Sequence, residues 1–227
     1  MQLETFEPQL DAPAGVYWLC SPNNPTGKVY PQEFLESLWT RYPHIYFVID
    51  SSYSYFTEAL LPDPSETIHR FPNVIFVTSL TKRYAMPGLR LGYVMAASEV
   101  IQRLSAYAAP WSVGSLAIAA GEWIVKYHFP HLLDRDQLFA ESRRLWNAID
   151  ALPYFEPQPT ETHFFLVGCT HPSIPTGEAL KSLLALRYGL LVRDATNFGY
   201  SAPTIRIATQ RPEENDLLIA ALTELSS

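Results

Sequence analysis

Cysteine is scarce in this sequence of 227 residues, acidic residues outnumber basic ones, and long apolar runs are absent. The two cysteines, Cys20 and Cys169, lie in apolar surroundings, which favours buried thiols in a reducing compartment over a disulfide or a metal site. A net charge of −7 leaves no basic patch for nucleic acid. No apolar run is long enough to span a bilayer, and the first residues lack a signal-peptide pattern. We therefore predict a soluble cytoplasmic protein that binds neither nucleic acid nor membranes.

The first part of the chain predicts an α/β fold. Four short apolar segments, 15–20, 45–49, 74–78 and 91–95, have the composition of buried strands. Amphipathic stretches separate the earlier ones. Apolar strands that alternate with helices are typical of a mostly parallel sheet covered on both faces. We expect a three-layer αβα arrangement here.

Helices dominate the middle of the chain, and a second pattern follows them. The sequence predicts a buried helix at 113–125 and a longer helix at 134–152. After Pro153, short strands are expected at 164–167, 190–192 and 204–208, together with two further helices. This mixed pattern indicates a small α+β C-terminal domain. We expect domains at 1–130 and 131–227, with the boundary within the long helix at about 126–150.

Lys82 follows the apolar segment 74–77 and is the most informative residue. Partial desolvation there would lower the pKa of the lysine and free the neutral amine that Schiff-base chemistry needs. Ser79 and Arg90 flank it with two donors suited to phosphate. A solvated Lys–Arg pair is one alternative. The Ser-x-x-Lys pair of serine acyl enzymes is another, but their Ser-Asp-Asn and Lys-Thr-Gly elements are absent. Together the residues suggest a site for pyridoxal 5′-phosphate (PLP).

Further polar residues follow predicted strands. Asp50 comes directly after 45–49, and ligands of open α/β sheets bind at the carboxyl ends of strands. A carboxylate there can keep a pyridine nitrogen protonated, and Tyr53 can donate to a ring oxygen. Asn24, in the segment 23–27, can donate to a ligand above the sheet. The plainer alternatives are a helix N-cap for Asp50 and a tight turn for 23–27.

Two arginines near the C-terminus are candidates for anion binding. Arg206 has apolar neighbours within the predicted strand 204–208. An arginine that points from a strand into a cleft can bind a substrate carboxylate in a bidentate manner. A surface arginine on a half-exposed strand is the alternative, and for Arg193 the two interpretations stand about even.

Taken in order, these motifs resemble those of the fold type I PLP-dependent aminotransferases of class I/II, over nearly the whole chain. The motifs are Asn24-Pro25-Thr26-Gly27, Asp50-x-x-Tyr53, Ser79-x-x-Lys82, Arg90 and Arg206. The resemblance implies PLP as cofactor and a homodimer. It implies that Lys82 holds PLP as an aldimine and moves protons at the substrate carbons. Asp50 would pair with the pyridinium nitrogen, while Asn24 and Tyr53 would bind the ring oxygen O3′.

The resemblance also assigns the anion-binding residues. Ser79 and Arg90 would hold the cofactor phosphate, and Arg206 would bind the substrate carboxylate. The segments 79–93 and 110–113 look most like the histidinol-phosphate aminotransferase branch, and within it like the L-threonine-O-3-phosphate decarboxylases of cobalamin biosynthesis. In this subgroup Arg193 would contact the phosphate of a small phosphorylated amino acid or amine. The bond at Cα that is held perpendicular to the ring plane is the one that breaks. A carboxylate held there gives decarboxylation, and a Cα–H bond held there gives transamination. The sequence does not reveal this angle, so a histidinol-phosphate-type aminotransferase is the alternative.

The sequence departs from the family pattern at three places. Position 163 is His where the branch usually has Asn, and position 53 is Tyr where the decarboxylases can carry Phe. The chain begins just before Asn24, so the family's N-terminal portion is expected to be missing. That portion carries a glycine-containing turn whose amides bind the PLP phosphate, so PLP binding is expected to be weak. A non-catalytic truncated fragment is therefore the second alternative.

Overall fold

The computed structural model describes residues 15–127, 133–200 and 202–226. These residues form two compact units. The first unit holds residues 15–21, 30–52 and 60–122, and the second unit holds all the others described. Two short segments early in the sequence, 22–29 and 53–59, thus belong with the C-terminal part of the chain. The domain boundary at about 126–150 stays a prediction.

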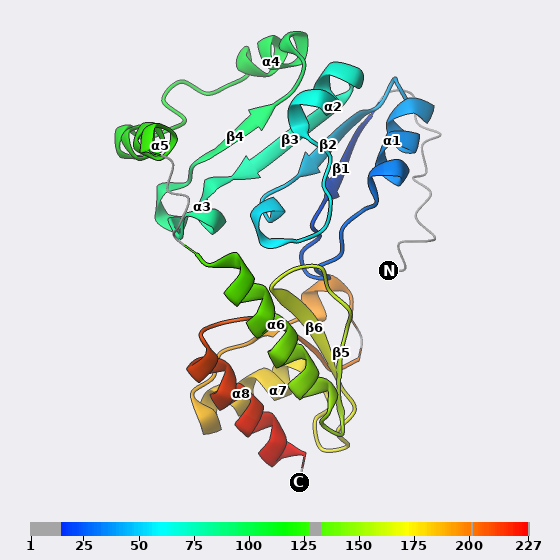
Figure 1. Ribbon diagram of the computed structural model, residues 1–227, viewed down its shortest axis with the longest axis vertical. Helices are drawn as coiled ribbons and strands as arrows, with labels where there is room; N and C mark the ends of the chain where they lie inside the picture. Colours follow the sequence, from blue (N-terminus) through cyan, green and yellow to red (C-terminus); the bar gives the residue numbers. More distant parts are fainter. Residues whose placement is uncertain (1–14, 128–132, 201, 227) are drawn as a thin grey trace. The chain divides into compact units, whose positions relative to one another are not determined.

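A four-stranded sheet forms the centre of the first unit, with the strand order β1-β2-β3-β4 (Figure 1). β1 pairs with β2 and β2 with β3 in parallel, whereas β4 is antiparallel to β3. The bounds are Val16–Cys20 for β1, Tyr46–Asp50 for β2, Val74–Ser79 for β3 and Gly92–Met95 for β4. The predicted α/β class with a mostly parallel sheet is confirmed.

Helices lie on both faces of this sheet. On one face, α1 (Gln32–Arg41) contributes Trp39 to a buried cluster with Phe47 and Phe76. On the other face, Val100 packs in a cluster with residues of β2 and β3. The remaining helical elements up to residue 127 are α2 (Pro64–Arg70), α3 (Leu80–Arg83), α4 (Ser98–Ser105), α5 (Ser115–Tyr127), η2 (Ser54–Phe56) and η3 (Pro87–Leu89).

The helix expected at 113–125 forms as α5, but the prediction that it is buried is wrong. Leu116 is 82% exposed and Val125 is 69% exposed, whereas Ala117 and Ile124 are buried. An apolar, alanine-rich composition favours a helix without specifying which surface will cover it. In the part of the chain that the structure describes, no helix is both long and apolar enough to cross a membrane.

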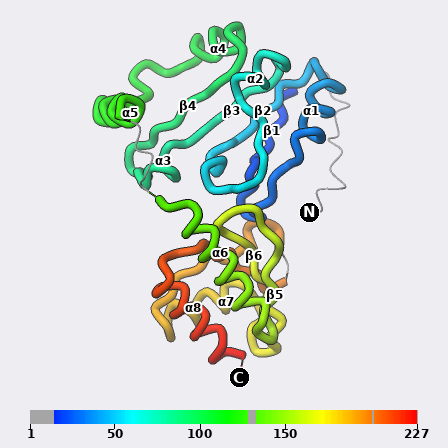
Figure 2. Tube along the Cα trace, in the orientation of Figure 1, coloured from blue at the N-terminus to red at the C-terminus, as the bar shows by residue number. Residues whose placement is uncertain are grey.

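The second unit is built on an antiparallel sheet with the order β5-β6-β8-β7. Figure 2 shows β5 and β6 running side by side after α6. Leu145, Leu180 and Leu222, one from each of three helices, pack in one core with Phe165 and Ile205 of the sheet. The bounds are α6 (Arg135–Asp150), β5 (Phe155–Pro157), β6 (Phe164–Cys169), α7 (Gly177–Tyr188), β7 (Arg193–Asp194), η4 (Thr196–Phe198), β8 (Thr204–Ala208) and α8 (Pro212–Leu225).

The strand expected at 190–192 is displaced toward the C-terminus. The ladder with β8 contains only Arg193 and Asp194, which pair with Arg206 and Ile205. Leu191 is 82% exposed, so its apolar character does not contribute to the core. The apolar segment gave the right neighbourhood for a strand but the wrong residues.

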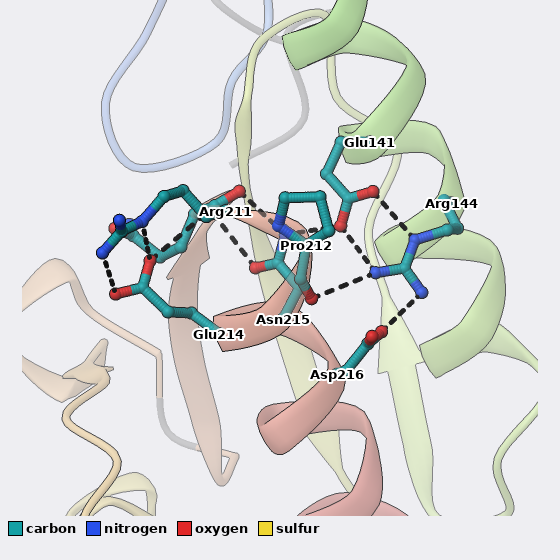
Figure 3. A network of polar contacts seen from close by, with 8 residues as sticks. Glu141, Arg144, Arg211, Pro212, Glu214, Asn215 and Asp216 are labelled. Carbon is teal, nitrogen blue, oxygen red and sulfur yellow. Dashed lines mark hydrogen bonds and ion pairs between the residues drawn. The ribbon is translucent and has the colours of Figure 1, made fainter.

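A polar network joins the start of α8 to α6 (Figure 3). The amide of the buried Asn215 donates to Oε1 of Glu141 at 2.7 Å and to the carbonyl of Gln210 at 3.0 Å. Arg144 forms ion pairs with Glu141 and Asp216, both at 2.7 Å. The hydrogen bonds from Arg144 and then from Asn215 hold the pKa of Glu141 below its usual value, against the effect of burial.

Asn215→Ala should lower the free energy of unfolding by about 2 kcal/mol, because it leaves buried polar partners without their hydrogen bonds. Urea unfolding of the purified chain measures this. Arg211→Ala is the control, since the Arg211 side chain is 80% exposed in its ion pair with Glu214. That variant should change stability by less than about 0.5 kcal/mol. Equal losses in the two variants would contradict a structural role for the buried amide.

Candidate functional site

Asp50 lies at the carboxyl end of β2, which has parallel neighbours on both sides. It is in register with Cys20 of β1 and Val77 of β3. Its Oδ1 accepts a hydrogen bond from the backbone N–H of Ser52 at 3.0 Å. This is a local turn contact, so the alternative of a helix N-cap does not apply. The carboxylate is fixed at the sheet edge where parallel α/β sheets bind ligands.

Lys82 lies in α3, directly beyond the end of the neighbouring strand β3. Ser79 caps this short helix, since its hydroxyl accepts from the backbone N–H of Thr81. The backbone N–H of Ser79 in turn donates to Oγ of Ser52 at 3.1 Å. The ends of β2 and β3 are therefore tied together, which brings the segments of Asp50 and Lys82 to the same sheet edge.

Two details differ from what the sequence suggested for this group. Lys82 is exposed, so burial does not provide the partial desolvation that was expected. The Ser79 hydroxyl already shares a hydrogen bond with Oγ1 of Thr81 at 2.7 Å, so it would have to reorient to donate to a phosphate. Lys82 therefore lacks the burial, and Ser79 the free hydroxyl hydrogen bond, that the motif implied for cofactor binding.

Arg90 lies near the same end of the sheet as Ser79 and Lys82. The backbone N–H of Leu80 donates to the carbonyl of Leu91, and Gly92 pairs with Ser79 across the β3–β4 ladder. A Cβ on Gly92 would lie 2.7 Å from the carbonyl oxygen of Thr78, so only glycine allows this approach. Arg90 is exposed, and its Nη1 donates to the carbonyl of Pro87 at 3.1 Å. Its guanidinium retains further donors for an anion.

In the second unit, Tyr53 and Arg206 contact one aromatic ring, Phe164, and Arg206 also binds Asn24. The guanidinium of Arg206 lies 5.4 Å from the centroid of Phe164, and its Nη1 donates to Oδ1 of Asn24. The ring of Tyr53 meets Phe164 edge-on, with centroids 4.8 Å apart. Sequence reasoning missed Phe164, because nothing in the apolar pattern distinguishes it from the adjacent core residue Phe165.

Arg193 and Arg206 are directly opposite each other on β7 and β8. Directly opposed residues in an antiparallel pair project from the same face, where like charges are destabilising. Both residues line a groove of about 830 Å³. Nε of Arg206 is buried and has no hydrogen-bond partner among the described residues. An anion in contact with the two guanidinium groups would relieve their repulsion, in a groove that Glu178, Asp194 and Glu214 also line.

Gly27 allows the turn that carries Asn24. Its φ is +71°, and a Cβ there would lie 1.9 Å from Oγ1 of Thr160 and 2.9 Å from the carbonyl oxygen of Phe164. The carbonyl of Gly27 accepts from the backbone N–H of Glu161 at 2.9 Å. The segment 22–29 thus packs closely against the residues that lead into β6, and a side chain at position 27 would separate them.

The predicted site residues fall into two groups, one in each unit. The first group is Asp50, Ser79, Lys82 and Arg90, and the second is Asn24, Tyr53, Arg193 and Arg206. Each group contains residues far apart in the sequence. Their roles toward a cofactor or substrate stay predictions.

A family model described as "Aminotransferase class I and II" matches residues 1–222 of the chain. The chain belongs to this family. It is 32% identical to the histidinol-phosphate aminotransferase of Staphylococcus haemolyticus over 233 residues, which cover 97% of this chain and 59% of that protein. It is 30% identical to the threonine-phosphate decarboxylase of Salmonella typhimurium over 229 residues, with the same coverage of both chains. The chain thus spans about three fifths of the length of these relatives.

Solved structures share this fold. The L-threonine-O-3-phosphate decarboxylase of Porphyromonas gingivalis has a TM-score of 0.86 and 33% identity, over 93% of this chain and 64% of that chain. The histidinol-phosphate aminotransferase of Sinorhizobium meliloti, solved in complex with PLP, has a TM-score of 0.72 at 24% identity, over 94% of this chain and 57% of that chain. The latter likeness shows the fold alone. The prediction of PLP as the cofactor of the family is confirmed.

Gly27→Ala should destabilise the protein more than Gly189→Ala, a matched control at φ +68° with open space around its Cβ position. The control carries only the left-handed backbone penalty of about 1–2 kcal/mol. The clash at position 27 adds about 1–3 kcal/mol. Urea unfolding of both variants gives the comparison. Equal destabilisation would show that the close packing of the 22–29 segment does not contribute.

Proposed function

We propose that this chain is, or forms part of, a PLP-dependent enzyme that decarboxylates L-threonine O-3-phosphate. The observation that carries the proposal is the opposed pair Arg193 and Arg206, which line one groove. A small substrate with a carboxylate at one end and a phosphate at the other supplies one anion for each guanidinium. The similarity to two threonine-phosphate decarboxylases supports this choice of substrate.

The residues of the first unit have the donor set that PLP requires. Asp50 would hold the proton on the pyridine nitrogen, and Ser79 and Arg90 would bind the phosphate. Lys82 would attach the aldehyde carbon through its amine. Three of these residues lie at or just beyond the carboxyl ends of two adjacent parallel strands, which supports a shared ligand. In the second unit, Asn24 and Tyr53 would donate to the ring hydroxyl oxygen.

The bound cofactor would supply an electron sink for the pair released when a bond at Cα breaks. The residues of the chain would bind, orient and move protons. Arg206 would hold the carboxylate and Arg193 the phosphate, which together fix the orientation of Cα. Carbon dioxide would leave Cα, and Lys82 would deliver the proton that replaces it. The product would be a phosphorylated amino alcohol.

Transamination of a histidinol-phosphate-like substrate is the second candidate. The similarity to histidinol-phosphate aminotransferases supports it, at 32% identity for the protein of Staphylococcus haemolyticus. The tyrosine at position 53 supports it too, because the family's aminotransferases carry Tyr there. A non-catalytic fragment that retains the fold is the third candidate, supported by the three-fifths length. We further propose a cytoplasmic homodimer, and a role in cobalamin biosynthesis if the decarboxylase assignment holds.

Borohydride reduction in the presence of PLP should leave a pyridoxyl group on Lys82, located by peptide mass mapping. Lys28 is the internal control, because it lies in the turn segment 22–29 and has no expected role. The label should be absent from Lys82→Ala. Scattered labelling of surface lysines, or no label at all, would favour the non-catalytic fragment.

Threonine phosphate supplied to the PLP-loaded protein should release carbon dioxide. Arg193→Gln should lower kcat/KM by about tenfold to a hundredfold, since a charge-assisted contact to the phosphate is lost. The same variant should bind PLP normally. If no carbon dioxide is released and a keto acid forms instead from an added amino-acid donor, the ranking would be reversed in favour of the aminotransferase.

A further inference from the structure

Arg135, the first residue of α6, reaches across to the segment 53–59. Its Nη2 donates to the carbonyl oxygen of Thr57 at 2.6 Å, across 78 positions of sequence. Its guanidinium lies 5.2 Å from the ring centroid of Tyr55 and 5.7 Å from that of Phe139. Nε is buried and has no hydrogen-bond partner among the described residues. Arg135 therefore contacts a backbone carbonyl and two aromatic rings, both of which attract a guanidinium.

The contacts of Arg135 fix one end of a short turn. Thr57 is buried and forms an isolated bridge with Thr162, just before β6. The turn itself is closed by the hydrogen bond from the backbone N–H of Phe56 to the carbonyl of Tyr53, at 2.8 Å. Tyr53 and Thr57 are thus the two ends of one tight unit. A shift of the Thr57 carbonyl would reach the backbone of Tyr53 through the three residues of η2.

The other side of this turn packs against the aromatic group that surrounds Tyr53. The ring of Phe56 lies 4.5 Å from that of His163 and 6.3 Å from that of Tyr53. Tyr53 in turn meets Phe164, on which the guanidinium of Arg206 rests. The Tyr53 ring is therefore held between aromatic packing on one side and a turn whose far end Arg135 secures.

We propose that Arg135 is a positioning residue for Tyr53, which it holds through the turn from Tyr53 to Thr57. This inference rests on the proposed function for its consequence, because Tyr53 would donate to the ring oxygen of PLP. Hydroxyl donors need placement within a few tenths of an ångström to form a good hydrogen bond. A second contact of the same segment, the ion pair of Arg143 with Glu58, is exposed on both sides and should contribute little.

The first test examines Tyr53 in the protein without cofactor. Arg135→Met is compared with Arg143→Met, which removes the same charge from the same helix. The aromatic carbon NMR signal of Tyr53, assigned with Tyr53→Phe, should shift or broaden in Arg135→Met and stay unchanged in Arg143→Met. An unchanged signal in Arg135→Met, or equal changes in both variants, would overturn the inference. Matching circular dichroism spectra show that each variant is folded, and Arg135→Lys should restore the signal in part if Arg135→Met does not fold.

The second test measures PLP affinity and the absorption spectrum of bound PLP. Arg135→Met should weaken binding by about tenfold, as expected for one lost hydrogen bond, and should shift the absorption maximum in the same direction as Tyr53→Phe. Arg143→Met should do neither. If the wild-type chain binds PLP and Arg135→Met binds it equally with the same spectrum, the positioning role fails. If the wild-type chain forms no adduct at Lys82, the proposed function fails, and the NMR result alone decides on Arg135.

Discussion

The parallel, in-register pairing of β2 with β3 is the constraint on which the candidate cofactor residues depend. Because Asp50 is opposite Val77, the chain leaves both strands at the same edge, where Ser52 and Ser79 form a hydrogen bond. A slip of one residue would turn every side chain of a strand to the other face. The apolar clusters on both faces of the sheet oppose such a slip. Packing in the core thus determines where a carboxylate and an amine meet the solvent.

In the second unit a single aromatic ring, Phe164, positions the candidate residues. Phe164 is fully buried at the start of β6, yet it contacts both Tyr53 and the guanidinium of Arg206. A cation over an aromatic face gains about 0.5–2 kcal/mol, which offsets part of the cost of partly burying the charge. The remaining cost comes from Arg193, directly opposite on the next strand. Arg193 and Arg206 offer two guanidinium groups to an anionic ligand, in a groove that Glu178, Asp194 and Glu214 also line.

Sequence patterns predicted the strands and singled out candidate residues at their ends, but not the contacts between distant segments. Asp50 became a candidate because an apolar run directly precedes it, and Lys82 because it follows the run 74–77 after a short polar segment. Arg206 and Asn24 are 182 positions apart, and no local pattern indicates their hydrogen bond. Arg135 was missed for the same reason, since its role depends on a carbonyl in another element. The exposure of α5 was missed because composition indicates a helix without naming its neighbours.

A diffraction structure of the protein crystallised with PLP tests most directly whether Asp50 and Lys82 serve one ligand. The account predicts continuous density between the aldehyde carbon and Nζ of Lys82, with the pyridine nitrogen at hydrogen-bond distance from the carboxylate of Asp50. Density for PLP on another lysine, or a ring whose nitrogen faces away from Asp50, would contradict it.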